Sequence, residues 1–256
     1  MTTPAQRKEL IRKLLKGIET GDPASVAVVN EEKYIQHNPQ TQEGSEGLAT
    51  LFARLSKTNP HVNVVRAFAD GDFVFAHTEY DFSTRRIGFE AFRFEGDQAV
   101  EHWDNIQPRR GPNGSGCSMV DGPTDPADPD RTEANRRIVR TFVEDVLIAR
   151  RLDQLPLYVD AEHFAQHNPG LEDGVTAWKA ALEATSDGGP LIAYHRVHRV
   201  LAEGSFVLSV SEGSLAGVRS AFYDLFRLTD GKLVEHWDTI EAVAPRSEWK
   251  NENGKF

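Results

Sequence analysis

Hydrophobic and polar positions follow two different periods in the first part of the chain. Apolar residues recur every three or four positions over residues 3–20 and again from Ser45 to Leu55, which predicts two amphipathic helices. Asp22-Pro23 predicts the start of a short helix between them, because an acidic N-cap and a proline in the first turn both suit a helix N-terminus. After Pro60 the period changes to two, which predicts strands at 61–70, 73–82, 86–95 and 98–107.

The second part of the chain repeats this order of elements. The pattern predicts helices at 131–150, 153–159 and 172–185, followed by strands near 191–203, 205–215, 219–228 and 232–242. Helices followed by an antiparallel meander are typical of an α+β fold. If each sheet is strongly curved, with three helices on its concave side, a pocket for a small molecule is expected between them.

Two tetrapeptides occur twice, in the same order, which indicates an internal duplication. Gln-His-Asn-Pro stands at 36–39 and at 166–169, and Glu-His-Trp-Asp stands at 101–104 and at 235–238. The stretches 92–104 and 226–238 are identical at 7 of 13 positions. We therefore expect two copies of one domain in tandem.

The region between the copies has the composition of a linker. Residues 109–130 are rich in Pro, Gly, Ser and Asp. The expected organisation is a first domain at 1–108, a linker at 109–130, a second domain at 131–245 and a C-terminal tail at 246–256.

Charge and composition narrow the classes of partner. The net charge is −10 and the pI is about 5.4, which disfavours nucleic acid and anionic membranes as partners. The single cysteine, Cys117, excludes an internal disulfide and favours a reducing compartment. No signal peptide or membrane-spanning stretch is visible, so we expect a cytoplasmic protein.

The last strand of each copy carries the strongest candidate chemistry. Side chains alternate between the two faces of a strand, so His102 and Asp104 share one face while Trp103 lies on the other. His236 and Asp238 repeat this arrangement. An apolar surrounding raises the pKa of a carboxyl group and an imidazolium lowers it, which is how an acid–base group is tuned to work near neutrality. The alternative is a structural His–Asp hydrogen bond that fixes the register of the strand.

Other polar residues are candidates for the same pockets. Glu90 and Asp224 are in phase with core aromatic residues and are expected to point inward, where each needs a partner or a ligand. His77 offers a further imidazole in the first copy, where the second has Val210. His37 and His167 could contact a ligand or latch the backbone. A metal held by His102, Asp104 and His77 is an open alternative, although no metal or other cofactor is the main expectation.

These motifs resemble the SnoaL-like branch of the NTF2-like superfamily, which has the cystatin-like fold. The resemblance lies in Tyr34–Pro39 with Phe92–Asp104, and in Phe164–Pro169 with Phe226–Asp238. It implies two cone-shaped α+β barrels that form a pseudo-dimer within the chain, as a monomer or a further homo-oligomer. Relatives include polyketide cyclases, ketosteroid isomerases and limonene epoxide hydrolases, which use a pocket carboxylate without metal or organic cofactor.

The resemblance leads to a hypothesis about function. The chain is expected to be a cofactor-free acid–base enzyme, of the aldol cyclase, isomerase or lyase type, acting on a small apolar carbonyl compound. Asp104 or Asp238 would remove a proton next to the carbonyl, and His102 or His236 would orient that carboxylate. His37 or His77 would stabilise the enolate oxygen. The alternatives are a small-molecule binding protein without turnover, and a hydrolase that uses an aspartate-activated water.

Overall fold

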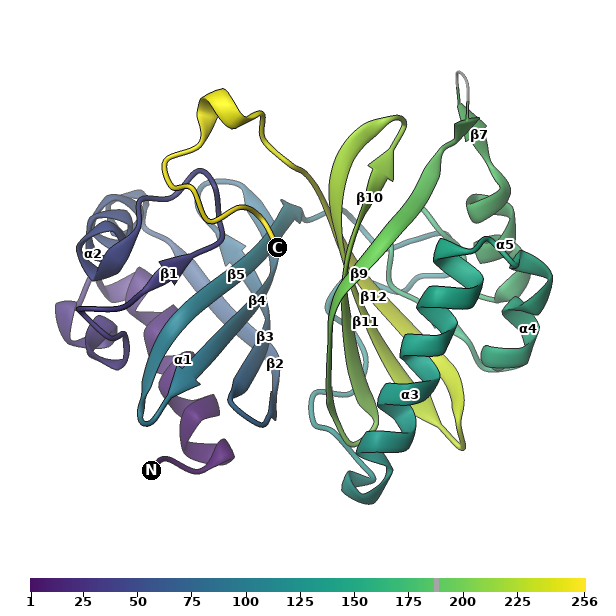
Figure 1. The fold of residues 1–256 in the computed structure, drawn as a ribbon, viewed down its shortest axis with the longest axis horizontal. Coiled ribbons are helices and arrows are strands. Elements are labelled where there is room, and N and C mark those ends of the chain that lie inside the picture. Colours follow the sequence, from purple (N-terminus) through teal and green to yellow (C-terminus); the bar gives the residue numbers. More distant parts are fainter. Residues whose placement is uncertain (187–188) are drawn as a thin grey trace. The chain divides into compact units, whose positions relative to one another are not determined.

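The computed structural model describes residues 1–186 and 189–256, and it confirms the α+β class (Figure 1). The chain packs as two compact units. One comprises Met1–Arg109 together with Val243–Phe256, and the other comprises Arg110–Ala242. Each unit contains a five-stranded sheet. Met1–Arg109 therefore packs with the C-terminal segment, and the segment expected to be a linker packs from Arg110 onward with the second sheet.

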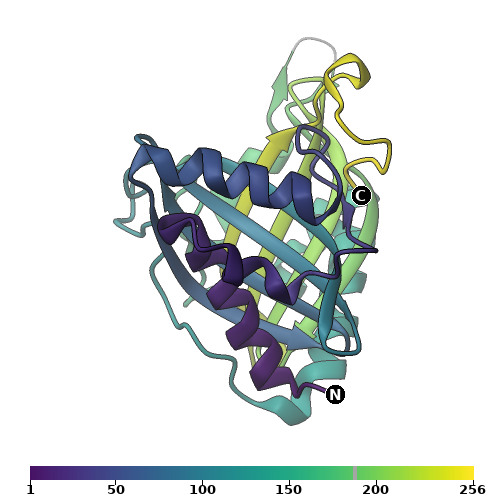
Figure 2. The ribbon, with the colours of Figure 1, turned by 90° about the vertical axis from the view of Figure 1, so that its left-hand side faces the viewer.

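Helices cover one face of the first sheet (Figure 2). Helix α1 (Pro4–Thr20) begins at Thr3, whose side chain caps the backbone of Gln6 while the Gln6 side chain caps Thr3 in return. The helix ends at Gly21, which has the positive φ of 64° that a left-handed cap requires. A 3₁₀ turn (Pro23–Val28) and helix α2 (Gly44–Leu55) complete this layer.

The first sheet has the order β1-β5-β4-β3-β2. Its antiparallel meander consists of β2 (His61–Asp70), β3 (Phe73–Asp81), β4 (Arg85–Glu95) and β5 (Gln98–Pro108). The fifth strand was not predicted. It is β1 (Ile35–Gln36), which pairs in parallel with β5 through the Gln-His-Asn-Pro segment. A two-residue strand has no periodicity for the sequence to reveal.

The second unit repeats this plan. Its helices are α3 (Thr132–Phe142), α4 (Leu155–Tyr158) and α5 (Val175–Glu183). Its sheet has the order β6-β12-β11-β10-β9. The strands are β6 (Ala165–Gln166), β9 (Ile192–Glu203), β10 (Phe206–Leu215), β11 (Val218–Thr229) and β12 (Lys232–Ala242), and a small separate pair is formed by β7 (Thr185–Ser186) and β8 (Gly189–Pro190).

One predicted helix changes type along its length. The helix expected over 131–150 is α-helical only to Phe142 and continues as a π-helix over Val143–Ile148. The N–H of Ala149 accordingly bonds to the carbonyl of Glu144, five residues back. Val139, Phe142, Val143 and Val146 are all fully buried. The same apolar spacing suits both helix types, so the sequence does not reveal the change.

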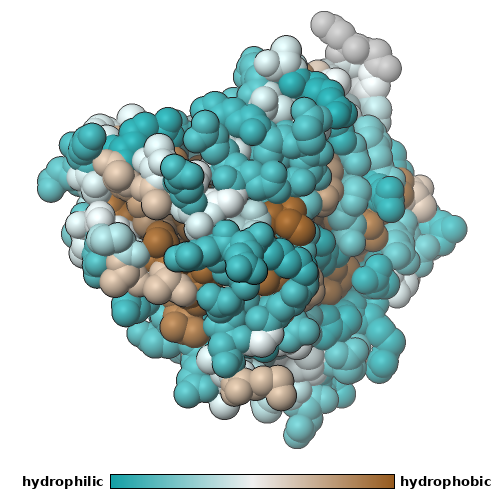
Figure 3. Space-filling model, turned by 60° about the vertical axis from the view of Figure 1, so that its left-hand side comes forward, coloured by the Kyte–Doolittle hydropathy of each residue, from teal (hydrophilic) through white to brown (hydrophobic). Residues whose placement is uncertain are grey.

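Apolar side chains fill the space between helices and sheet in each unit. In the first unit, Ile11, Leu14 and Leu15 of α1 pack with Phe92 and Phe94 of β4. These side chains form the core on the side of the sheet where the sequence led us to expect a pocket. Among the residues that the structure describes, no helix is long and apolar enough to cross a membrane. Hydrophilic residues dominate the surface shown in Figure 3, and hydrophobic residues appear between them.

Candidate functional site

The register of the sheets places the candidate carboxylates and imidazoles on one face. Glu90 of β4 lies opposite Asp104 of β5, and Phe92 lies opposite His102. Residues directly opposite each other in an antiparallel pair share a face. Because Phe92 packs in the core with α1, this is the face covered by the helices. In the second unit, Asp224 lies opposite Asp238 and Phe226 lies opposite His236.

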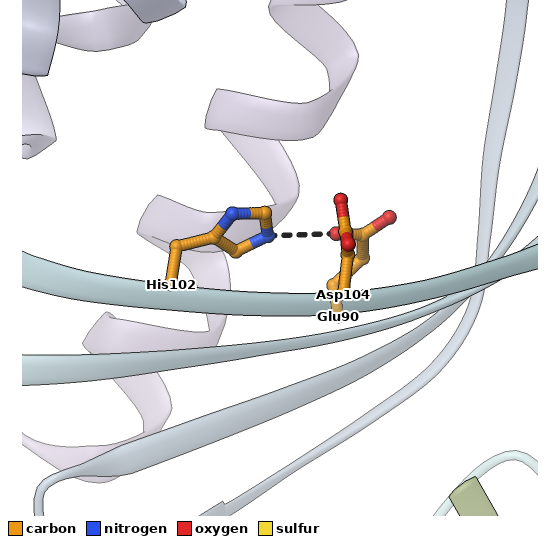
Figure 4. A group of neighbouring side chains, drawn as sticks. All are labelled: Glu90, His102 and Asp104. Carbon is orange, nitrogen blue, oxygen red and sulfur yellow. Dashed lines mark hydrogen bonds and ion pairs between the residues drawn. The ribbon is translucent and has the colours of Figure 1, made fainter. Parts of the chain in front are cut away.

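The first cluster consists of Glu90, His102 and Asp104, which are 4–6% exposed (Figure 4). His102 Nε2 lies 2.8 Å from Glu90 Oε2, and the Tyr80 hydroxyl donates to Glu90 Oε1 over 2.6 Å. Asp104 accepts a hydrogen bond from the Asn38 amide at 2.8 Å. The ammonium group of Lys255 lies 3.4 Å from its other oxygen. Asp104 is thus paired with a buried cation.

The second cluster repeats the first with one carboxylate shortened. His236 Nε2 lies 3.1 Å from Asp224 Oδ1, and the Tyr194 hydroxyl donates to the same oxygen over 3.1 Å. The Asn168 amide donates to Asp238 over 2.6 Å. The other oxygen of Asp224, Oδ2, is buried without a hydrogen-bond partner among the described residues. A tyrosine hydroxyl thus donates to Glu90 in the first unit and to Asp224 in the second. The two tyrosines come from different strands, Tyr80 from β3 and Tyr194 from β9.

A glutamine fixes the proton on one nitrogen of each histidine. The side-chain oxygen of Gln36 accepts the backbone N–H of Asn38 at 2.9 Å and lies 3.0 Å from His102 Nδ1. An oxygen can only accept, so Nδ1 of His102 carries a proton. Gln166 holds His236 in the same way. The remaining nitrogen, Nε2, therefore faces the carboxyl group and shares a proton with it.

Burial gives Asp238 an acid–base range near neutrality. Burial raises the pKa of Asp238, His236 lowers it, the Asp224 carboxylate raises it again and the Asn168 hydrogen bond lowers it, with a net value of about 6. Burial and the Asp224 carboxylate also hold the pKa of Tyr194 well above its usual range. At neutral pH, Asp238 is therefore a carboxylate that can take up a proton, while Tyr194 remains a neutral donor.

His37 and His167 lie on the face of each sheet that is opposite the carboxylate clusters. This corrects the expectation that they could contact a ligand in the same pocket. Their rings stack on Trp103 and Trp237, with centroids 4.6 Å apart in both units. His37 Nε2 lies 2.9 Å from Glu101 Oε1, and His37 Nδ1 lies 3.2 Å from the carbonyl oxygen of Gly254. His167 Nε2 lies 2.9 Å from Glu235 Oε1, and His167 Nδ1 lies 2.6 Å from the carbonyl oxygen of Ser118. These histidines are latches for the chain, and neither belongs to a carboxylate cluster.

His77 also lies away from the first cluster. It is opposite Phe89 in the register, one position out of phase with Glu90, and therefore occupies the other face. Its Nδ1 lies 2.7 Å from the guanidinium of Arg66, which is 1% exposed. Because arginine can only donate, His77 accepts here and serves as a packing partner. The metal set that combined His77 with His102 and Asp104 is therefore excluded by the fold.

A metal ion would need the clusters themselves. One ligand atom from each of Glu90, His102 and Asp104 lies within 4.8 Å of the others, and the same holds for Asp224, His236 and Asp238. In both clusters, however, the imidazole nitrogen that could bind a metal, Nε2, is hydrogen-bonded to a carboxyl group, that of Glu90 in the first unit and that of Asp224 in the second. This donor arrangement fits a proton-sharing pair.

Sequence reasoning did not single out several residues that shape these clusters. Gln36, Asn38 and their counterparts lie in a repeated motif, so the repeat itself was the available signal. Trp178 of α5 stacks on His236 with centroids 4.9 Å apart and is 3% exposed. In the sequence Trp178 aligns with Leu48, so the repeated motifs did not mark it as part of a site. Outside the clusters, a groove of about 500 Å³ lies between α1 and β2.

We expect Glu235→Gln to change how stability depends on acid. Burial raises the pKa of Glu235. The hydrogen bonds from His167 and Arg227 lower this pKa by more than burial raises it, so the net shift is downward. A lowered carboxyl pKa stabilises the fold above the unfolded value of about 4.5 and loses that contribution as the pH falls through the folded value. Glu235→Gln is expected to cost about 1–3 kcal/mol at pH 7 and less at pH 3.

Urea unfolding at several pH values checks this expectation. The exposed substitution Glu31→Gln serves as the control, because Glu31 lies on the surface. Equal losses at pH 7 and pH 3 for Glu235→Gln would show that the carboxylate does not contribute through its ionisation.

Comparisons with known proteins show the following similarities. The sequence model of the SnoaL-like domain matches residues 11–102. Similar solved structures include TsrD from Streptomyces laurentii (19% identity, 42% of this chain and 92% of that one, TM-score 0.38) and a proposed ketosteroid isomerase from Kribbella flavida (20%, 45% and 84%, TM-score 0.38). An NTF2-like protein from Cytophaga hutchinsonii is also similar (17%, 42% and 96%, TM-score 0.36). No curated protein matches the sequence. The match to the SnoaL-like model thus lies within the first unit, and the two five-stranded sheets have equivalent strand orders.

Proposed function

We propose that the second unit is a cofactor-free acid–base site that acts on a small, mostly apolar carbonyl compound. The observation that carries the proposal is the meeting of two buried carboxyl groups with one imidazole on the helix-covered face, at Asp224, His236 and Asp238. Asp238 is the base of the proposed reaction. The likeness of the first unit to SnoaL-like domains supports the same chemical class.

Each residue has a defined part in the proposed reaction. The Asp238 carboxylate takes a proton from the carbon next to the carbonyl. The electrons of that C–H bond form a carbon–carbon double bond, and the π electrons of the carbonyl move to its oxygen. The His236–Asp224 pair supplies or shares the proton that stabilises the enolate. Return of the proton to a different carbon of the enolate system completes an isomerisation. In an aldol closure, the enolate carbon attacks a second carbonyl, and the proton held by Asp238 goes to the new alkoxide oxygen.

The two units are unequal candidates for this role. One oxygen of Asp104 lies 3.4 Å from the ammonium group of Lys255, so this carboxylate is already paired with a buried cation. The pKa of Asp238, by contrast, is raised to about 6. A base whose pKa lies close to the working pH is both ionised and able to hold a proton. We therefore assign turnover to the second unit.

Binding without turnover is the second candidate, and the burial of the cluster favours it. Asp224, His236 and Asp238 are only 0–7% exposed, and Trp178 covers His236. A ligand reaches them only if side chains above the cluster move. A protein that merely holds an apolar ligand would still need these buried polar groups to be satisfied.

Proton exchange in heavy water distinguishes the two candidates. We expect the protein to accelerate deuterium incorporation into small cyclic and aryl ketones, measured by NMR, with a rate that rises as the pH passes through about 6. Ketones that raise the melting temperature but exchange no faster than in buffer would overturn the catalytic proposal and leave binding as the function.

A further inference from the structure

The last residues of the chain reach the carboxylate cluster of the first unit. Residues 243–256 follow the second sheet in sequence but pack within the first unit. Lys255 is 4% exposed, and its ammonium group lies 3.4 Å from Asp104 Oδ1. A buried lysine needs a partner of opposite charge, and this partner is a carboxylate of the candidate site.

A set of directed hydrogen bonds holds this segment in place. The Asn251 amide donates to the carbonyls of Asn38 and Thr41 at 2.8 and 3.0 Å. The Asn253 amide donates to the carbonyl of Gln36 at 3.2 Å and to the Glu43 carboxylate at 2.8 Å. Three of these acceptors belong to the loop between β1 and α2, and the fourth, Gln36, is the last residue of β1. The segment is therefore fastened to β1 and to the loop after it, which supply Gln36 and Asn38 to the cluster.

The second unit has a corresponding segment with a different residue at the decisive position. The Asn113 amide donates to the carbonyls of Gln166 and Leu171 at 2.6 and 2.8 Å. The carbonyl of Ser118 meets the latch His167, as that of Gly254 meets His37. The residue after this carbonyl is Met119 in one segment and Lys255 in the other, and both are buried. At this position the side chain is thus the thioether of Met119 in one segment and the ammonium group of Lys255 in the other.

We propose that residues Lys250–Phe256 are an intrachain cap on the first unit, and that Lys255 is the counter-ion that keeps Asp104 from acting as a base. The inference rests on the proposed function for its catalytic consequence. Lys255 occupies one oxygen of Asp104 in the first cluster, whereas the corresponding segment of the second unit has Met119, and displacement of the cap frees Asp104. The capped site is then a latent second site for the same class of carbonyl compound.

The catalytic test uses the full chain with the second site disabled. In the Asp238→Asn background, Lys255→Met copies the residue of the other segment while leaving the Asn251 and Asn253 anchors intact. We expect ketone exchange at least about tenfold above that of Asp238→Asn alone, since a general base contributes about 10²–10⁴-fold. Lys255→Arg, which keeps the charge, is expected to give no gain. If Lys255→Met gives no gain while Asp238→Asn alone has lost activity, the assignment of Lys255 as the counter-ion is wrong.

A second readout tests the cap without any activity. Acylation of lysine amines by an activated acetyl ester, followed by peptide mass spectrometry, is expected to modify the exposed Lys250 at least about tenfold faster than the buried Lys255. Asp104→Asn removes the counter-ion and is expected to narrow that difference. Equal modification of the two lysines in the unaltered protein would overturn the cap. Protection of Lys255 without ketone exchange in any variant would leave the cap standing and reject the proposed function.

Discussion

Replacing Asp238 by asparagine is expected to lower the rate of ketone exchange by about 10²–10⁴-fold, which is the usual contribution of a general base. The amide has nearly the shape of the carboxyl group, and its oxygen can still accept the hydrogen bond that Asn168 donates over 2.6 Å. The substitution therefore removes the proton acceptor and leaves the packing. Exchange rates measured by NMR between pH 5 and pH 8 check the expectation, and the rise near pH 6 should disappear with the carboxyl group.

The same substitution is expected to stabilise the protein at alkaline pH. The pKa of Asp238 is raised from 3.8 to about 6, so its stabilising contribution is complete below about 3.8 and is lost as the pH rises through about 6. Above that pH, an ionised Asp238 costs the folded state about 2–3 kcal/mol. Asp238→Asn should therefore melt several degrees higher than the unaltered protein at pH 8, with little difference at pH 4.

The matched control is Asp104→Asn in the first unit. It removes the equivalent carboxylate but leaves Lys255 buried without its counter-ion, so it is expected to destabilise the protein and to leave ketone exchange within about twofold. If both aspartates affect exchange equally, the two units work as equals and the assignment to the second unit is wrong. If neither affects it, the base lies elsewhere.

The strands and the main helices could be predicted because each has a long periodic pattern. β2, for instance, begins and ends at the predicted residues, His61 and Asp70. The two short parallel strands were not predicted, since they are defined by pairing with residues 66 positions away in the first unit and 70 positions away in the second. His37 N–H, for example, donates to the carbonyl of His102. Nothing within a two-residue strand encodes such a distant partner.

The face of each site residue depended on phase along its strand. Phase is reliable on a long regular strand, so the sequence placed His102 and Asp104 together. His77 was assigned to the same site because the sequence gives no relation between the phases of neighbouring strands. The register shows that it lies one position away from alignment with Glu90. Lys255 could not be predicted for another reason: it lies 151 residues from Asp104, and it belongs to neither of the two repeated tetrapeptides.

Trp178→Ala is expected to have the largest effect on stability, about 3–5 kcal/mol. Trp178 is 3% exposed and packs against Phe142, Phe164 and Phe226 as well as His236. Removing the indole leaves a cavity directly over the imidazole, because the surrounding side chains belong to rigid helices and strands and relax only in part. Urea unfolding at pH 7 measures the loss.

The cavity also tests whether a ligand can reach the second cluster from the helix side. Added indole is expected to raise the melting temperature of Trp178→Ala and to leave the unaltered protein unchanged, since an apolar cavity of this size binds an apolar guest. The matched variant is Trp178→Leu, which supplies the residue of the first copy, Leu48, and should lose less stability. An Ala variant that loses less than about 1 kcal/mol and gains nothing from indole would show that this space collapses, and that the route to His236 does not pass beneath α5.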